Sequence, residues 1–391
     1  MRMQRWALAS LAAVTAMLVA GCGGNNAGAD SSSVKVAVVY SRTGLLAAYG
    51  KNYVDGFTAG LDYATHGSGK AGGHKIEVTY ADDAGDPAKA TDAAKQYIGA
   101  GYKIVAGTAD SGIATQLGPL AAQNKVLYIS GPAATDKITG MNRYVFRSGR
   151  QTYQDVATAG TFIDDPAGKN VLVFAQDSTF GQGNAAAVKA ILGAKGAQVS
   201  QVLVPGTATD FTPFARQAAQ AKADLVFVAW AGATTLPMWQ ALDQQKVLSS
   251  TTVVTGLGNA ASFSAYGSAA EKISFLSYYF PQATDNPVDT AMITAIQKAG
   301  SSPDLFSPDG FVAAQMIVHA VEGAGGDNVD KMIRTLEGWT FDAPKGSQTI
   351  RAGDHAMLQP MFQATLVPQG TGWEPKLGKV IPADTTAPPG T

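Results

Sequence analysis

Two loops carry the hydroxyl groups best suited to holding a small anion. The loop Gly107–Gly112 contains Ser111, and the loop Ser130–Thr135 ends on Thr135. Each loop follows an apolar segment, so its hydroxyl lies beside N–H groups that a helix start leaves unpaired and that attract negative charge. Two neighbouring loops of this kind suit a carboxylate. Ser111 and Thr135 would equally serve as helix N-caps alone, and the sequence leaves both interpretations open.

Two glycine-rich turns match part of the dinucleotide-binding fingerprint, Gly181–Ala186 and Gly256–Ala261. Each follows an expected strand, as the fingerprint requires. Neither is followed after about 20 residues by an acidic residue that could hold a ribose, and neither lies on the first crossover of its series. We therefore expect tight strand-to-helix connections here and no nucleotide cofactor.

The residues that usually bind metals are poorly spaced for that purpose. Asp82, Asp83 and Asp86 lack the spacing of a calcium loop, and Pro87 marks a helix start with Asp86 as its N-cap. The histidines form no pair at ligand spacing; they are His66, His74, His319 and His355. The chain also lacks a nucleophile elbow and a P-loop. We expect no metal, no cofactor and no catalytic residues.

Short β-branched runs separated by amphipathic segments predict alternating strands and helices. In the first series the expected strands are Val34–Tyr40, Lys75–Ala81, Lys103–Ala106 and Val126–Ile129. In the second series they are Val171–Ala175, Gln198–Val204, Leu225–Ala229, Thr251–Thr255 and Ile273–Ser277, with a final strand inside Pro360–Val367. Helices of 10–15 residues between strands indicate right-handed crossovers and parallel sheets. Two such series predict an α/β protein with two lobes.

Composition supports two lobes and excludes several classes of protein. The chain has 391 residues, which at about 150 residues per domain predicts two domains or lobes. Its 29 basic and 30 acidic residues nearly cancel, so no positive field is available for nucleic acid. Hydrophobic residues make up 46% of the chain, enough for a sizeable core. The single cysteine excludes a disulfide framework.

The N-terminus has the layout of a bacterial export signal. Arg2 and Arg5 precede the apolar run Trp6–Ala20, and the sequence Val-Ala-Gly-Cys ends at Cys22, the only cysteine. This pattern resembles a lipobox, which predicts a signal peptide over residues 1–21, a lipid on Cys22 and a flexible tether over residues 22–33. The alternative is an ordinary secreted protein with a chance cysteine. Residues 381–391 are expected to be a disordered tail.

Taken together, several motifs resemble those of the type I solute-binding proteins of bacterial ABC importers, in the leucine/isoleucine/valine-binding group. The resemblance extends from Val34 to about Val367, and no single motif is diagnostic. The matching segments are Val36–Val39, Thr43-Gly44 with Tyr49-Gly50, Asp82-Asp83 with Asp86-Pro87, the Ser111 loop, Pro132–Thr135, Phe180-Gly181, Asp210-Phe211 and Asp224–Phe227.

The resemblance implies two Rossmann-like lobes that close on a solute and are joined by three crossover strands. Lobe 1 would comprise residues 34–148 plus 282–358, and lobe 2 residues 149–281 plus 359–380. Ser111 and Thr135 would hold the solute's carboxylate, and the Ala133 carbonyl would accept from an amine. Tyr49 and Phe180 would form opposite walls of the cleft.

The sequence departs from the amino-acid-binding pattern in the second lobe. The position of a family tyrosine is Ala233, and that of a glutamate near the ligand's amine is Leu257. A buried ammonium needs a charged partner, so this departure favours a carboxylate without an α-ammonium. A slip in the alignment, or an amine partner such as Asp177 or Asp309, is the alternative.

We therefore expect a monomeric, lipid-anchored binding protein at the outer face of the cytoplasmic membrane or in the periplasm. It would capture a small carboxylate, either a branched-chain amino acid or a related aliphatic or aromatic acid. It would deliver this solute to an ABC permease and its ATPase without catalysing a reaction. The rivals are a sensor of the same fold for amides or urea, and a secreted α/β enzyme.

Overall fold

The computed structural model describes residues 33–390. The predicted signal peptide, the lipid attachment at Cys22 and nearly all of the predicted tether lie outside these residues. Within them, six strands form the first sheet in the order β2-β3-β1-β4-β5-β6. The pairs from β3 to β6 are parallel, and β2 pairs antiparallel with β3. The strands are β1 Val34–Tyr40, β2 Lys70–Ala71, β3 His74–Asp82, β4 Ile104–Gly107, β5 Leu127–Ser130 and β6 Val145–Arg147.

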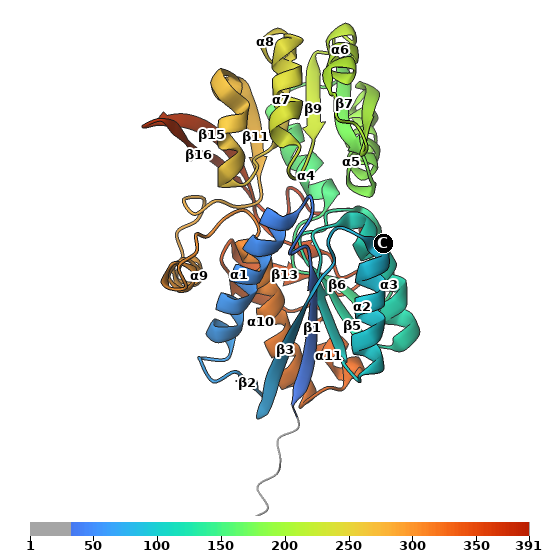
Figure 1. Cartoon of the computed structure of the whole chain (residues 1–391), viewed down its shortest axis with the longest axis vertical. Coiled ribbons are helices and arrows are strands. Elements are labelled where there is room, and N and C mark those ends of the chain that lie inside the picture. The colour runs from blue at the N-terminus through green and yellow to red at the C-terminus, as the bar shows by residue number, and fades with distance from the viewer. Residues whose placement is uncertain (1–32, 391) are drawn as a thin grey trace, which may run out of the picture. The chain divides into compact units, whose positions relative to one another are not determined.

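Helices cover both faces of this sheet, which explains why its central strands are almost wholly apolar (Figure 1). The helices on one face are α1 Ala47–Ala64, α10 Ser307–Ala324 and α11 Val329–Leu336, and those on the other are α2 Pro87–Gly99 and α3 Ser111–Asn124. Helices α1 and α10 meet backbone to backbone: a Cβ on Gly56 would lie 1.8 Å from the Ser307 carbonyl oxygen. This contact fixes the start of α10, which borders the cavity described below.

The second sheet contains seven strands in the order β16-β15-β11-β10-β9-β7-β8, counted within the described residues. The pairs from β8 to β11 are parallel, whereas β15 and β16 are antiparallel additions. The strands are β7 Asn170–Asp177, β8 Gln198–Pro205, β9 Leu225–Ala229, β10 Thr252–Gly256, β11 Ile273–Ser277, β15 Met361–Gln369 and β16 Gly372–Ile381.

Helices also cover both faces of the second sheet. One core contains α4 Thr152–Ala159 and α5 Thr179–Ile191, and the other contains α6 Thr212–Gln220, α7 Thr235–Gln244 and α8 Val247–Ser250. A further small sheet consists of β12 Thr340–Ala343, β13 Gly346–Ile350 and β14 Met357–Leu358. Helix α9 comprises Pro287–Lys298.

The chain passes between the two lobes three times. It leaves β6 for α4, leaves β11 for α9 and returns from β14 to β15. This arrangement confirms the predicted fold class, an α/β protein with two lobes, parallel sheets and three crossovers.

Helix α3 continues through Pro119 as a single helix. The structure differs from the expectations in two places. The last sheet gains β16, where only one final strand was expected. Residues 381–390 are not a detached tail, because the Arg351 guanidinium donates to the carbonyls of Pro388 and Pro389.

Candidate functional site

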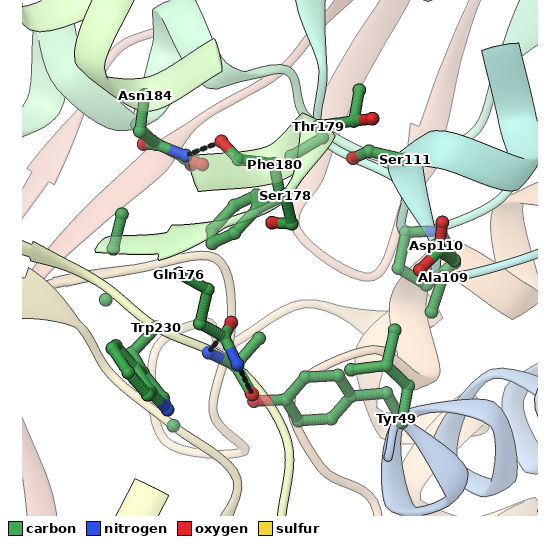
Figure 2. A pocket seen from close by; sticks show the side chains of 18 of the residues that line it. Tyr49, Ala109, Asp110, Ser111, Gln176, Ser178, Thr179, Phe180, Asn184 and Trp230 are labelled. Atoms are coloured by element: carbon green, nitrogen blue, oxygen red, sulfur yellow. Dashed lines mark hydrogen bonds between the residues drawn. The ribbon is translucent and has the colours of Figure 1, made fainter. Parts of the chain in front are cut away.

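A cavity of about 290 Å³ lies where the carboxyl ends of the two sets of parallel strands meet. Ligands of open α/β sheets bind at this end of the strands. Both sheets contribute walls to the cavity, and Figure 2 shows Tyr49 extending from α1 toward Gln176 and Trp230 of the second sheet. Its lining includes Leu45, Tyr49, Asp110, Ser111, Pro132, Arg150, Asp155, Asp177, Phe180, Trp230, Leu257, Tyr278 and Phe306.

Ser111 lines the cavity, but it is the first residue of α3 and not its cap. Asp110 is the N-cap, and its carboxylate accepts a 2.9 Å hydrogen bond from the Ile113 N–H. The Ser111 hydroxyl oxygen accepts from the Thr135 N–H at 3.2 Å. Burial raises the pKa of Asp110 above its ordinary value. The backbone N–H groups that donate to its carboxylate act in the opposite direction. A carboxylate of the protein itself thus occupies part of the expected anion site.

Ala133 and Thr135 do not line the cavity. Both are almost fully buried, and the loop presents Pro132 and Ala134 to the cavity instead. Thr135 is the N-cap of the short 3-10 helix that follows, where its hydroxyl oxygen accepts from the Lys137 N–H at 3.4 Å. Thr135 therefore lies behind Ser111 as seen from the cavity. Its backbone N–H orients the Ser111 hydroxyl.

Aromatic rings form much of the cavity wall, and those of Tyr49 and Phe180 are among them. Tyr49 meets Phe306 edge to face at 5.0 Å between ring centroids, and Phe306 stacks on Tyr278 at 5.6 Å. From the second sheet, the Trp230 indole N–H donates to the Thr234 hydroxyl at 3.0 Å, which fixes its ring. These contacts hold the rings in place before any ligand enters.

The two positions that depart from the amino-acid-binding pattern have different locations. Leu257 is 1% exposed and belongs to the cavity wall. Ala233 lies outside the lining, and its N–H donates to the Leu45 carbonyl at 3.2 Å. Of the acids named as alternative amine partners, Asp177 lines the cavity, whereas Asp309 is buried outside it near Lys345.

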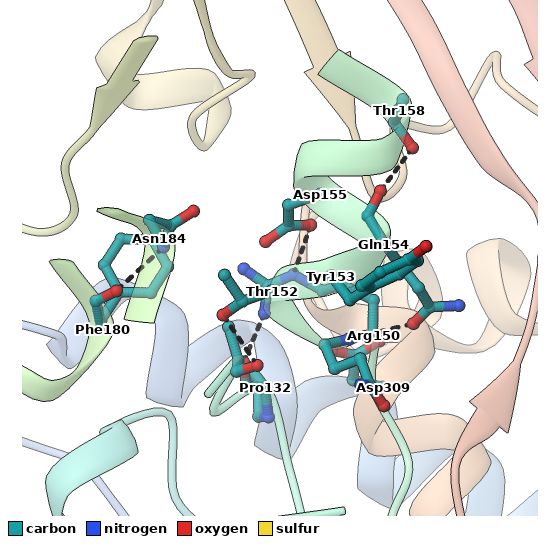
Figure 3. A network of polar contacts seen from close by, with 12 residues as sticks. Pro132, Arg150, Thr152, Tyr153, Gln154, Asp155, Thr158, Phe180, Asn184 and Asp309 are labelled. Atoms are coloured by element: carbon teal, nitrogen blue, oxygen red, sulfur yellow. Dashed lines mark hydrogen bonds and ion pairs between the residues drawn. The ribbon is translucent and has the colours of Figure 1, made fainter. Parts of the chain in front are cut away.

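Sequence reasoning missed Arg150, which is 3% exposed and lines the cavity. Its Nε donates to an Asp155 carboxylate oxygen at 3.3 Å and its Nη1 to the Pro132 carbonyl at 2.5 Å (Figure 3). Its guanidinium carbon lies 3.8 Å from the centroid of the Tyr278 ring.

Burial raises the pKa of Asp155 to about 6, although Arg150 beside it acts in the opposite direction. Burial alone would lower the pKa of Arg150, but Asp155 and Tyr278 raise it.

The only signal for Arg150 in the sequence is its place at the first crossing, three residues after Arg147, in a chain where only 15% of residues are charged. Two arginines so close together between apolar segments indicate a buried polar cluster, although not which residue faces the ligand. Arg147 is buried outside the lining and donates to the carbonyls of Arg150 and Thr135.

Within residues 33–390 no cluster of three or more histidine, cysteine, aspartate or glutamate side chains has the geometry of a metal site. Nor does this described range contain a helix long and apolar enough to cross a membrane.

A family model described as periplasmic binding protein matches residues 33–371. The chain belongs to the periplasmic binding protein family. It is of the type I kind found in ABC branched-chain amino acid transporters. This periplasmic binding protein is 28% identical to Leu/Ile/Val-binding protein homolog 3 of Brucella melitensis, over 76% of this chain and 81% of that one.

Two solved structures show the same fold as this periplasmic binding protein. An ABC-type branched-chain amino acid transporter protein from Rhodopseudomonas palustris has 32% identity and a TM-score of 0.75, covering 90% of this chain and 98% of that one. A solute-binding protein of an ABC transporter from R. palustris, in complex with 4-hydroxybenzoate, has 24% identity and a TM-score of 0.81, covering 90% and 97%.

Proposed function

We propose that this protein is the solute receptor of an ABC importer and captures a small carboxylate in the cavity between its lobes. The observation that carries the proposal is the cavity itself, which both sheets line at their carboxyl ends. Its volume of about 290 Å³ lies at the lower end of the usual range of roughly 300–1,000 Å³ for ligand pockets. Such a volume suits a solute the size of a branched-chain or benzoic acid.

The walls support an aliphatic or aromatic body for this solute. Trp230 and Phe180 offer ring faces, and Leu257 offers an aliphatic surface. Burying such a solute gains free energy in proportion to the apolar area removed from water. The complex of the R. palustris relative makes 4-hydroxybenzoate a reasonable first probe.

The apolar wall favours a solute without an α-ammonium group. At the position of the family glutamate the lining presents Leu257, which would face an ammonium with an apolar surface. Each of the three carboxylates in the lining has one partner: Asp110 caps α3, Asp177 accepts from the Gln182 amide at 2.7 Å, and Asp155 pairs with Arg150. Only Asp155 is balanced by a cation, so a bound ammonium would have to use Asp110 or Asp177 in place of the missing glutamate.

Delivery to a permease and its ATPase, lipid attachment at Cys22 and a monomeric state belong to the same proposal. The relatives are named as binding or transporter proteins, which supports capture without catalysis. Lobe 1 would comprise residues 34–148 plus 282–358 and lobe 2 residues 149–281 plus 359–380. The three crossings would serve as hinges.

A thermal-shift screen of ligand-free protein tests the proposal. The panel consists of 4-hydroxybenzoate, benzoate, 4-methyl-2-oxopentanoate, leucine, isoleucine, valine, acetamide and urea. A ligand at 100 times its dissociation constant adds about 2.7 kcal/mol to the free energy of unfolding. We expect a carboxylate to give the largest shift. A shift with acetamide or urea and none with any carboxylate would contradict the proposal and favour an amide sensor.

A further inference from the structure

The cavity contains one strong cation whose position suits recognition of the solute. Arg150 is the sole lysine or arginine in the lining, taken over the residues that the structure describes. Two other buried basic side chains, those of Arg147 and Lys345, are engaged elsewhere. Arg147 donates to two backbone carbonyls, and Lys345 donates to Gln359. The only positive charge in the described lining is therefore that of Arg150, which Asp155 balances in the empty protein.

The guanidinium is held rigidly, as a recognition group must be. It stacks on Tyr278, and the Phe306 ring centroid lies 5.4 Å from its central carbon. Asp155 and Pro132 accept from Nε and Nη1. A guanidinium has five N–H donors in a planar fork that matches a carboxylate. Two acceptors do not use up these donors, so the fork can bind a ligand without first being ordered.

The start of α3, which the sequence also indicates as an anion site, is less favourable for a solute carboxylate than Arg150. At the start of α3, the Asp110 carboxylate already accepts the Ile113 N–H. A solute carboxylate placed there would face that negative charge across a short distance. The Ser111 hydroxyl can still donate a hydrogen bond, but it cannot supply the charge that a desolvated carboxylate requires.

Asp155 provides a way to keep the charges balanced. One oxygen pairs with Arg150, whereas Oδ2 is buried and has no hydrogen-bond partner among the described residues. When a second carboxylate approaches Arg150, a proton on Oδ2 removes the repulsion between the two acids. In the empty cavity Asp155 therefore acts as the counterion that the solute replaces.

We propose that Arg150 is the specificity-determining residue of the cavity and binds the solute's carboxylate, with Asp155 as its counterion in the empty protein. This inference rests on the proposed function and deepens it, because it names the group that separates acids from neutral analogues of the same shape. Arg150 is a binding residue and not a catalytic one.

The test compares a carboxylate with its own primary amide. Calorimetric titration is carried out with 4-hydroxybenzoate and 4-hydroxybenzamide, or with 4-methyl-2-oxopentanoate and its amide if the first acid gives no thermal shift. The variants are Arg150→Gln and, because a lone Asp155 could impair folding, the double variant Arg150→Gln/Asp155→Asn. Arg143→Gln removes the same charge from an exposed ion pair with Asp330 and serves as the control.

We expect wild type and Arg143→Gln to prefer the acid over the amide by roughly 10- to 100-fold, as for a charge-assisted pair. Both Arg150 variants should lose most of this preference, while their affinity for the amide stays within about threefold of wild type. A preference that survives in the double variant would overturn the inference and leave the proposed function intact. Equal weakening of acid and amide would also overturn it, since it assigns Arg150 a structural role. Failure of wild type to bind any acid counts against the proposed function itself.

Discussion

The backbone N–H of Ala233 donates a 3.2 Å hydrogen bond to the carbonyl of Leu45, which joins the second lobe to the first beside the cavity. Gly232 makes this contact possible. Its φ is +83°, and a Cβ at this position would lie 2.6 Å from the Leu45 carbonyl oxygen. The lobes can approach this closely only because residue 232 has no side chain.

Gly232→Ala should therefore weaken solute binding without unfolding either lobe. The new methyl group would clash with Leu45 when the lobes meet, and the backbone strain adds about 1–3 kcal/mol. We expect at least about tenfold weaker binding of the best carboxylate, measured by calorimetry. Gly168→Ala is the matched control, because Gly168 has a φ of +73° and no atom within 4 Å of the added carbon. Equal effects of the two changes would show that strain alone, and not the interlobe contact, limits binding.

Carboxylate binding should strengthen as the pH falls toward about 6, the pKa of Asp155 in the empty cavity, and should level off below it. Burial raises the pKa of Asp155 to about 6, and an anion on Arg150 raises it further, so binding takes up a proton. Asp155 interacts electrostatically with the other titratable groups around it, which are Arg150, Arg147, Asp136, Tyr278 and Lys345. The pKa of Lys345, lowered by burial to about 8, keeps that residue mostly protonated below pH 7.5.

We expect affinity for the acid to be about 3- to 10-fold higher at pH 5.5 than at pH 7.5. The neutral amide should show no such dependence, and Asp155→Asn should abolish it for the acid. Titrations in buffers of different ionisation enthalpy measure the proton uptake directly. A pH-independent affinity would mean that Asp155 stays ionised beside the bound solute.

Removal of each of the two hydroxyls predicted to hold the carboxylate should affect stability and affinity differently. Ser111→Ala deletes a group in the cavity lining and leaves the buried Thr135 N–H without its acceptor. It should cost about 1–3 kcal/mol in the free energy of unfolding and weaken binding of the acid. Thr135→Val removes a hydroxyl that lies outside the lining and keeps the side-chain shape. Denaturation curves and titrations of both variants check this, and a greater loss of affinity in Thr135→Val would show that Thr135 reaches the solute.

Membrane attachment should depend on Cys22, the only cysteine in the sequence. Cys22→Ala removes the thiol that a lipid would modify, so the full-length chain should leave the membrane fraction while its thermal stability stays unchanged. Fractionation of cells that express wild type and variant measures this. Membrane association that persists in the variant would contradict lipid anchoring.

The fold was largely predictable because its strands are short, apolar and separated by helices. Strand β1 and strand β9 match their expected bounds, and Asp86 caps α2 as expected. Strand β16 was missed because only Ile381 of its residues is buried, so it has no apolar periodicity and depends on pairing with β15.

The site was only partly predictable, for physical reasons. Asp110 and Ser111 are adjacent and both favour helix caps, and only the register of α3 decides that Asp110 is the cap. The predicted carbonyl of Ala133 belongs to a residue that tertiary packing buries completely. Arg150 gains its position from two crossings that lie far apart in the sequence, since Arg150 belongs to the first and Tyr278 to the second. No local pattern encodes such a contact.

The most direct test of the account is calorimetric titration of ligand-free wild-type protein with 4-methyl-2-oxopentanoate and with leucine, two solutes that differ at the α-carbon. We predict one solute per chain and binding of the oxo acid that is tighter by at least tenfold, or about 1.4 kcal/mol. The reason is that Leu257, at the position of the family glutamate, faces an ammonium with an apolar surface. Tighter binding of leucine by the same margin would contradict the account, because an ammonium would then have a partner in this cavity.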